Sequence, residues 1–245
     1  MKTFFWILYQ PYKWLFLIPF IAINSIFFGI LAVSLSLLIN QKIGSYVGGV
    51  VWAKINTMLT PAIVKIYGKQ HIHKSQSYVI VSNHLSTYDI FAFYGWLGID
   101  FKWVMKKEIK KYPGIGFGSQ SVGHIFVDRS STAEAIKSIN AAKEKIKGGT
   151  SVIFFPEATR SKTRELLPFK KGAFRFAFDL GLPILPVTIN GTDKVFPADT
   201  WYLFPGKVEI IIHPPIEIKN YQGKIIQQLV ADTKEIIASS RKLVT

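Results

Sequence analysis

The sequence predicts an α/β domain, in which helices flank a mixed, mostly parallel sheet, preceded by a hydrophobic helical membrane anchor at the N-terminus. Three observations support this prediction. An uncharged, apolar run stands near the start of the chain, and short strand-like runs alternate with helical stretches from about residue 70 onward. The chain has 245 residues, of which 49% are hydrophobic, enough for one sizeable core. We therefore expect an anchor over residues 1–65 and an α/β domain over 66–245.

The anchor is predicted from the run Trp14–Gln41, which exceeds the roughly 20 residues that cross a bilayer. Basic residues flank both of its ends, so the positive-inside rule gives no clear orientation. The flanking lysines are Lys2, Lys13, Lys42 and Lys54. This symmetry favours a monotopic hairpin of two helices in one leaflet, with lysines at the level of the phosphates. A single span and a buried core helix are the alternatives.

The elements of the α/β domain follow from short apolar runs and their boundaries. We predict strands over residues 78–82, 101–105, 124–128, 151–155, 184–189 and 208–213, and helices over 132–147, 172–180 and 223–241. The first of these helices has a capping box, Ser131 with Glu134, and the pair Gly148–Gly149 ends it.

Composition excludes several classes of site. The absence of cysteine rules out disulfides, thiolate zinc sites, cysteine-ligated iron–sulfur clusters and a cysteine nucleophile. The net charge of +15 predicts an anionic partner, and a mean hydropathy of +0.25 favours membrane lipids over nucleic acid. The histidines outside the first strand's turn are dispersed and match no zinc spacing, so we expect no metal and no cofactor.

The turn after the first strand carries the sequence Asn83-His84-Leu85-Ser86-Thr87-Tyr88-Asp89. On one continuous helix, His84 and Asp89 would lie about 140° apart around the axis. They can meet if His84 precedes a helix and Asp89 lies in its first turn. The carboxylate would then orient a general base. A surface histidine beside a helix-start aspartate is the alternative, and Ser86 fits a cap better than a nucleophile.

Four ordered blocks resemble the 1-acyl-sn-glycerol-3-phosphate acyltransferase family of glycerolipid acyltransferases. The blocks are the NH-x4-D motif at 83–89, Gly123-His-Ile-Phe126-Val-Asp-Arg129, Phe155-Pro-Glu157-Ala158-Thr159-Arg160-Ser161 and Leu185-Pro-Val-Thr-Ile189. The resemblance covers roughly residues 70–215, and the apolar N-terminus is similar to bacterial members. Ala158 departs from the family, which has glycine there. If the loop requires a positive φ, alanine costs of order 1 kcal/mol.

The resemblance implies phospholipid biosynthesis: acyl transfer to lysophosphatidic acid, giving phosphatidic acid, by direct attack of the acceptor hydroxyl. The donor would be acyl-CoA or acyl carrier protein, and the site would face the cytoplasm from the inner membrane. His84 would be the base that Asp89 orients, and the second and third blocks would bind substrate. These binding residues are Gly123, Phe126, Arg129, Glu157, Thr159 and Arg160.

Several interpretations remain open beside the resemblance. Lys106 follows a strand end and is the most promising further substrate-binding residue, although most basic residues of its cluster fit a solvated face. For Glu157, a structural ion pair with a nearby arginine is the alternative to substrate binding. The acceptor could be glycerol 3-phosphate or another lysophospholipid. A lipid hydrolase or a basic membrane-binding protein would explain fewer of the motifs.

Overall fold

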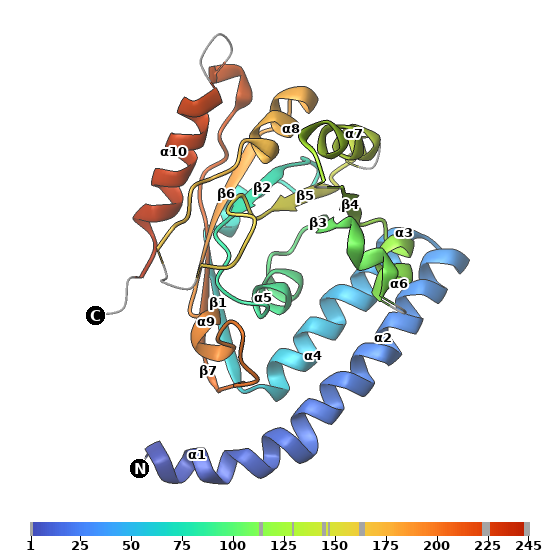
Figure 1. Cartoon of the computed structure of the whole chain (residues 1–245), viewed down its shortest axis with the longest axis vertical. Helices are drawn as coiled ribbons and strands as arrows, with labels where there is room; N and C mark the ends of the chain where they lie inside the picture. Colours follow the sequence, from blue (N-terminus) through green and yellow to red (C-terminus); the bar gives the residue numbers. More distant parts are fainter. Residues whose placement is uncertain are drawn as a thin grey trace.

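One seven-stranded sheet organises the chain in the computed structural model, which describes residues 2–112, 115–128, 130–143, 146, 148–161, 165–221 and 226–242. The strand order is β1-β7-β6-β2-β5-β3-β4. Within this described sheet only β6 and β7 pair antiparallel, and the other neighbours are parallel. The predicted fold class is therefore confirmed, and Figure 1 shows helices on both sides of the sheet.

The elements lie close to their predicted positions. The strands are β1 (Ala62–Tyr67), β2 (Val79–Ser82), β3 (Phe101–Lys106), β4 (Ile125–Val127), β5 (Ser151–Phe154), β6 (Ile184–Asn190) and β7 (Gly206–Ile212). The helices of this domain are α5 (Asp89–Trp96), α6 (Ile115–Ser121), α7 (Thr132–Ala142), α8 (Gly172–Leu180), α9 (Thr192–Val195) and α10 (Ile226–Ser239), with 3-10 turns at Lys69–His71, Lys107–Lys111 and Ile218–Tyr221. The predicted cap of α7 is present, because the Ser131 side chain accepts a hydrogen bond from the Glu134 N–H at 3.2 Å.

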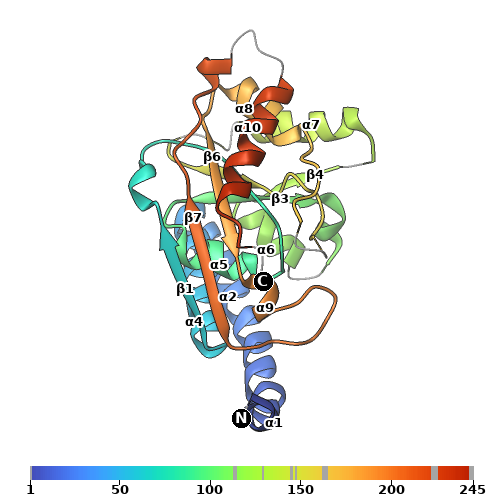
Figure 2. The same ribbon diagram turned by 90° about the vertical axis from the view of Figure 1, so that its left-hand side faces the viewer.

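Strand β1 was not predicted. Its residues Ala62–Tyr67 alternate between buried and exposed positions and pair parallel with β7. Figure 2 shows β1 and β7 side by side at the edge of the sheet. The expected boundary after residue 65 falls inside this strand, so the chain passes from the anchor directly into the sheet.

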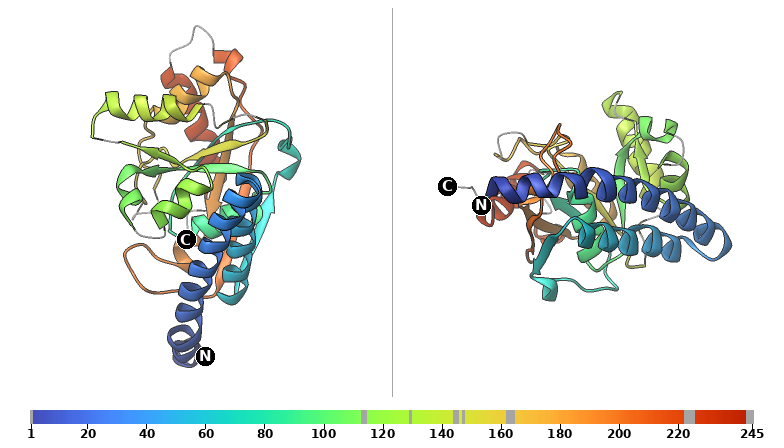
Figure 3. Two further views of the ribbon diagram at one scale, coloured as in Figure 1. Left: turned by 90° about the vertical axis from the view of Figure 1, so that its right-hand side faces the viewer. Right: turned by 90° about the horizontal axis from the view of Figure 1, so that it is seen from below.

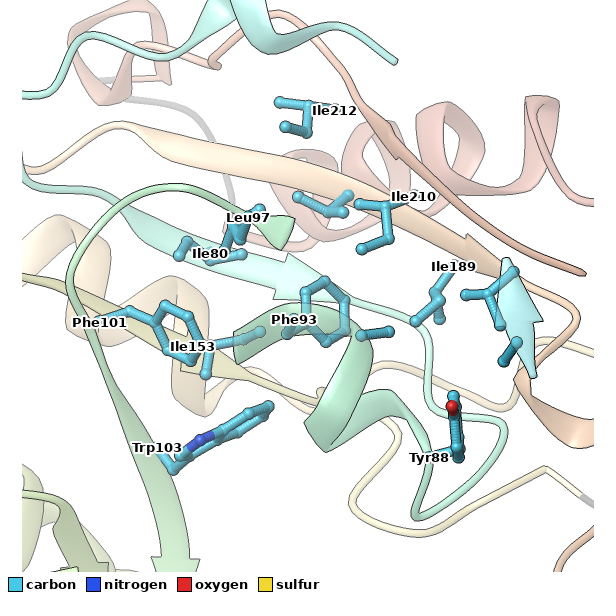
Figure 4. Close-up of a cluster of buried hydrophobic side chains, with 14 of the residues drawn as sticks. Ile80, Tyr88, Phe93, Leu97, Phe101, Trp103, Ile153, Ile189, Ile210 and Ile212 are labelled. Carbon is cyan, nitrogen blue, oxygen red and sulfur yellow. The ribbon is translucent and has the colours of Figure 1, made fainter. Parts of the chain in front are cut away.

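The core lies on both faces of the sheet because successive residues of the central strands point to opposite sides. Ile80 belongs to one buried cluster with Phe93 of α5, Ile153 of β5 and Trp103 of β3, as Figure 4 shows. Val79 and Val81 face the opposite way, toward residues of α8 and α10. A central strand buried on both sides reads as a continuous apolar run, which is why β2 was predicted well.

The N-terminal region forms a hairpin of two helical arms, called the anchor below after its predicted role. The first arm comprises α1 (Lys2–Pro11), a π-helical segment (Tyr12–Leu17) and α2 (Ile18–Leu38). The second comprises α3 (Gln41–Ser45), a π-helical segment (Tyr46–Val51) and α4 (Trp52–Leu59). Figure 3 shows the two arms running side by side. Buried Asn24 donates to Asn56 at 3.2 Å, and Trp52 donates to Ser25 at 3.0 Å, so polar contacts fix how the arms are aligned.

The first arm carries a broad apolar surface. By length and composition, the helical stretch Ile7–Leu38 could cross a membrane. Most of its large side chains are exposed, among them Leu15, Phe16, Ile23, Ile26, Phe27, Ile30, Leu37 and Leu38. Exposed apolar surface of this extent on a helix marks contact with lipid or with another protein.

Candidate active site

The predicted histidine turn leaves the sheet at the C-terminal end of β2. Asn83, its first residue, donates to the Ile189 carbonyl and accepts from the Ile189 N–H, both at 2.9 Å. This side chain continues the pairing of β2 with β6 beyond the last residue of the strand. The turn therefore begins from a fixed point at the sheet edge where α/β proteins bind ligands.

His84 and Asp89 are in contact, as the spacing predicted. Helix α5 begins at Asp89, and His84 Nδ1 lies 2.7 Å from Asp89 Oδ2. The same oxygen accepts the N–H groups of Leu85 and Ser86 at 2.9 and 3.2 Å, and Asp89 is fully buried. A carboxylate beside Nδ1 selects the tautomer with the proton on Nδ1. Nε2 is then left as the proton acceptor.

The loop that follows β5 holds His84 from three directions. Glu157 Oε1 accepts the His84 N–H at 2.9 Å, and the Ser161 N–H donates to the His84 carbonyl at 3.1 Å. The Phe155 ring stacks on the imidazole with centroids 4.0 Å apart. The two motifs, more than 70 residues apart in sequence, therefore form one structural unit around the histidine.

Both carboxylate oxygens of Glu157 accept backbone N–H groups. Oε2 takes the N–H of Leu167 at 2.8 Å, which ties the far end of the loop to the same side chain. Burial raises the pKa of Glu157, and the hydrogen bonds from Leu167 and His84 oppose that rise. A carboxylate occupied in this way supports the loop. The described residues also place Arg241 near enough to act on it electrostatically.

Ala158 has the positive φ at which we expect alanine to be strained. Its φ is 61°, a region that L-residues other than glycine enter at a cost. The residue joins Glu157 to the exposed Thr159, so the strained turn separates the buried half of the loop from its exposed half.

A cavity of about 1090 Å³ opens beside His84. Its wall is mostly apolar and comes from both the anchor and the α/β domain. The lining residues include Ile30, Val33 and Trp52 of the anchor together with Met105, Phe117 and Phe155 of the domain. A volume of this size with few polar groups suits an acyl chain.

Part-buried Tyr94 and buried His124 form part of the same wall. The hydroxyl of Tyr94 lies 2.5 Å from His124 Nε2, and the backbone N–H of Trp103 points at His124 Nδ1 at 3.4 Å. Burial raises the pKa of Tyr94. This pair was not singled out from the sequence, because α5 and the turn before β4 meet only in the fold.

Two of the cationic residues predicted to bind substrate, Arg160 and Lys106, lie on the exposed side of the site. Arg160 donates to Thr87 at 3.2 Å and to Asp199 at 3.0 Å, which places its guanidinium beside the histidine turn. Lys106 is exposed at the end of β3 and lies on the cavity wall with His84. Arg129 lies outside the described residues.

Gly123 and Phe126 stand apart from the cavity wall. Gly123 has a φ of 84°, and a Cβ there would lie 2.8 Å from the Gln41 side chain, so the glycine permits close approach of the anchor. Phe126 lies beneath the Lys110 ammonium, 5.0 Å from its ring centroid. In the part of the chain that the structure describes, no group of three or more His, Asp or Glu side chains could hold a metal ion.

Comparison with known proteins agrees with these motifs. Residues 63–190 match the Acyltransferase family. The 1-acyl-sn-glycerol-3-phosphate acyltransferase of Saccharomyces cerevisiae is 31% identical over 86% of this chain and 73% of that protein. The chain belongs to the 1-acyl-sn-glycerol-3-phosphate acyltransferase family. The resemblance predicted from the four blocks is thereby confirmed.

The family likeness extends to plant and bacterial proteins. A chloroplast 1-acyl-sn-glycerol-3-phosphate acyltransferase of Brassica napus is 38% identical over 68% of this chain and 47% of its own length. The chain thus spans about half the length of that relative. The crystal structure of PlsC from Thermotoga maritima, a 1-acyl-sn-glycerophosphate acyltransferase, matches all of both chains with a TM-score of 0.79 and 25% identity.

Proposed function

We propose that the protein is a membrane-bound 1-acyl-sn-glycerol-3-phosphate acyltransferase. It transfers a fatty acyl group to the sn-2 hydroxyl of lysophosphatidic acid and forms phosphatidic acid. The observation that carries this proposal is the oriented His84–Asp89 pair beside a large apolar cavity. Family membership supplies the reaction class, and the apolar first arm supports attachment to a membrane.

In the proposed mechanism His84 acts as a general base. Its Nε2 takes the proton from the acceptor hydroxyl as the oxygen attacks the thioester carbonyl. The C–O bond forms, the tetrahedral intermediate collapses with cleavage of the C–S bond, and the leaving thiolate takes the proton back from the imidazolium. Asp89 stabilises the imidazolium while it exists, since its buried carboxylate is 2.7 Å from Nδ1.

The acyl chain is proposed to occupy the apolar cavity. Each CH2 group that leaves water there gains about 0.8 kcal/mol, so a long chain contributes much of the binding energy. Residues of α2 supply part of the wall, and the exposed face of the same helix would contact lipid. The anchor would in this way place the cavity at the interface where the acceptor lipid resides.

The acceptor phosphate is proposed to bind on the exposed, cationic side of the site. Arg160 and Lys106 are the described candidates, and Arg129 and Thr159 remain predictions from the motifs. A guanidinium fork suits bidentate binding of a phosphate. Glu157 is proposed to position His84, because its two oxygens already accept backbone N–H groups. We keep acyl-CoA and acyl carrier protein as alternative donors, with the site on the cytoplasmic face of the inner membrane.

The proposal is tested by the product formed from lysophosphatidic acid and each donor. The purified full chain and its His84→Ala variant are incubated with acyl-CoA or acyl carrier protein thioester, and lipids are analysed by mass spectrometry. Phosphatidic acid from the wild type alone is the expected result. Free fatty acid with the acceptor unchanged would replace the proposal with a thioester hydrolase. Turnover of glycerol 3-phosphate but not lysophosphatidic acid would change the acceptor.

A further inference from the structure

A second cavity, of about 700 Å³, lies on the other side of Tyr94 from the cavity beside His84. Ser45 and Tyr94 belong to the walls of both cavities. The second cavity lies between the second arm of the anchor and the connection from α5 to β3. Its wall combines three lysines with apolar and aromatic side chains: Lys42, Lys54, Lys69, Tyr46, Trp96 and Phe101.

The charge of this cavity is not neutralised from within. Its one carboxylate, Asp100, is already engaged by Lys102 at 3.3 Å and by the Thr150 hydroxyl at 2.9 Å. Neither the Lys54 nor the Lys69 ammonium makes a hydrogen bond or ion pair with another described residue. Among the described residues, the Lys42 ammonium reaches a backbone carbonyl, that of Gly148, at 3.5 Å. All three lysines are exposed, so the cavity presents a cluster of solvated ammonium groups that favours an anionic occupant.

The apolar part of the wall continues toward the surface of the anchor. Tyr46 is 58% exposed and Ile43 is 38% exposed, and both line the cavity. The aliphatic stem of Lys54 packs against α5 at Gly95, where a Cβ would make an ordinary van der Waals contact of 3.5 Å with Lys54 Cγ. One end of the occupant must therefore be charged and the other apolar, and it must be reachable along the anchor.

We propose that this second cavity binds an anionic glycerophospholipid of the host leaflet. The lysines contact its phosphate, and an acyl chain lies along Ile43, Tyr46 and Val50. This lipid is not a substrate, since Tyr94 and Ser45 separate it from the cavity beside His84. The inference goes beyond the proposed function and does not depend on it: the binding of a structural lipid requires no acyl transfer.

The test is native mass spectrometry of the full chain in detergent. The protein is incubated with 1-palmitoyl-2-oleoyl phosphatidylglycerol or with the phosphatidylcholine of the same chains, and the retained lipid is counted. Lys54→Ala/Lys69→Ala is expected to bind phosphatidylglycerol at least about tenfold more weakly, as loss of charged contacts predicts. Lys54→Arg/Lys69→Arg should retain it, and phosphatidylcholine should bind weakly to all forms.

The matched control is Lys65→Ala/Lys207→Ala, which removes the same charge from exposed positions on the paired strands β1 and β7. Equal loss of phosphatidylglycerol in this control would overturn the proposal, because it would show a response to net charge. Release of the lipid by acyl-CoA would also overturn it and assign the cavity to the donor. Circular dichroism and thermal unfolding of the Lys54→Ala/Lys69→Ala variant in detergent, measured beside the binding, show whether the variant is folded. Because neither measurement requires turnover, failure of this proposal and failure of the proposed function are distinguishable.

Discussion

The two sides of the candidate active site differ in how they are held. On the histidine side, the imidazole, the N–H and the carbonyl of His84 each have a protein partner, from Asp89, Glu157 and Ser161. On the cationic side, Arg160 contacts the exposed Asp199, and Lys106 extends from a strand end. The proposed base is thus held by protein partners before substrate arrives, whereas the proposed binding groups are free to exchange their exposed contacts for a phosphate.

This difference has a physical reason. A general base gains from preorganisation, because misplacement by a fraction of an ångström reduces the rate of proton transfer. A phosphate brings its own charge and can replace a weak surface contact such as that between Arg160 and Asp199. Substitutions on the histidine side should therefore lower kcat, and substitutions on the cationic side should raise KM for the acceptor.

The largest effect is expected from the base itself. His84→Ala should lower kcat by about 10²–10⁴-fold, and Asp89→Asn should approach the same loss because it no longer favours the required tautomer and the imidazolium. Product formation by mass spectrometry measures both. His73→Ala, at an exposed position, is the control and should retain full activity. Wild-type turnover by His84→Ala would remove the histidine from the mechanism.

Glu157→Gln tests whether the loop positions the base. The amide turns an NH2 group toward a backbone N–H, so unfolding free energy should fall by about 1–3 kcal/mol. We expect kcat to fall with little change in KM for lysophosphatidic acid. Exposed Glu108→Gln is the control, measured by the same kinetics and thermal unfolding. A raised KM at constant kcat and constant stability would instead place the carboxylate among the substrate contacts.

Arg160→Ala removes a guanidinium from the cationic side of the site. Loss of a charged contact to phosphate predicts a rise in KM for the acceptor of roughly 10- to 100-fold, with a smaller change in kcat. Arg160→Lys should restore only part of the lost affinity for the acceptor, because an ammonium cannot form the bidentate contact. Arg175→Ala, exposed on α8, should leave both constants unchanged. An unchanged KM in Arg160→Ala would exclude this residue from the phosphate site.

Ala158→Gly tests the backbone strain at the residue that joins the histidine side of the loop to its exposed side. At a φ of 61° glycine relieves the backbone strain of alanine, but it also raises the conformational entropy of the unfolded chain. We expect the net effect to be a rise of about 0.5–1 kcal/mol in the free energy of unfolding. Chemical denaturation of the two proteins measures this difference. A loss of stability would mean that the methyl group of Ala158, on the cavity wall, contributes more by packing than its backbone costs.

The smallest effect concerns the exposed ion pair between Lys107 and Asp128, beside the second block. Hydrogen bonds from Lys107 and Ser130 lower the pKa of Asp128 from 3.8 to about 2. A lowered folded pKa means that the pair stabilises the fold above the ordinary aspartate range and that this contribution is lost as pH falls toward 2. Carboxyl NMR shifts should show the low midpoint, and Lys107→Ala should return it toward 3.8. A midpoint near 3.8 in the wild type would show that the pair does not persist in solution.

Local patterns predicted much of this architecture. The His84–Asp89 contact depends on residues five positions apart, and the strands that were predicted are rich in apolar, β-branched or aromatic residues. Strand β1 was missed because its alternating residues follow the hydrophobic anchor and resemble its continuation. The support that Glu157 gives to His84 was also missed, since it joins segments more than 70 residues apart and leaves no local pattern.

The cavities could not be predicted from the sequence, because they too are formed by segments that are far apart in the chain. Residues of α2, α5, β3 and α6 enclose the larger one, and no spacing in the sequence indicates that these segments share a wall. The role of Arg129 stays a prediction from its motif.

That shared wall makes the anchor part of the protein's interior as well as its proposed attachment to the membrane. A foreign membrane segment grafted in place of residues 1–40 would restore tethering yet leave the larger cavity open along the side that Ile26, Ile30 and Val33 now close. Under the proposed function, attachment to the membrane and the choice of acyl chain would therefore be inherited together, because a substitution in the first helix that suits a different lipid would also reshape the cavity proposed to hold the acyl chain.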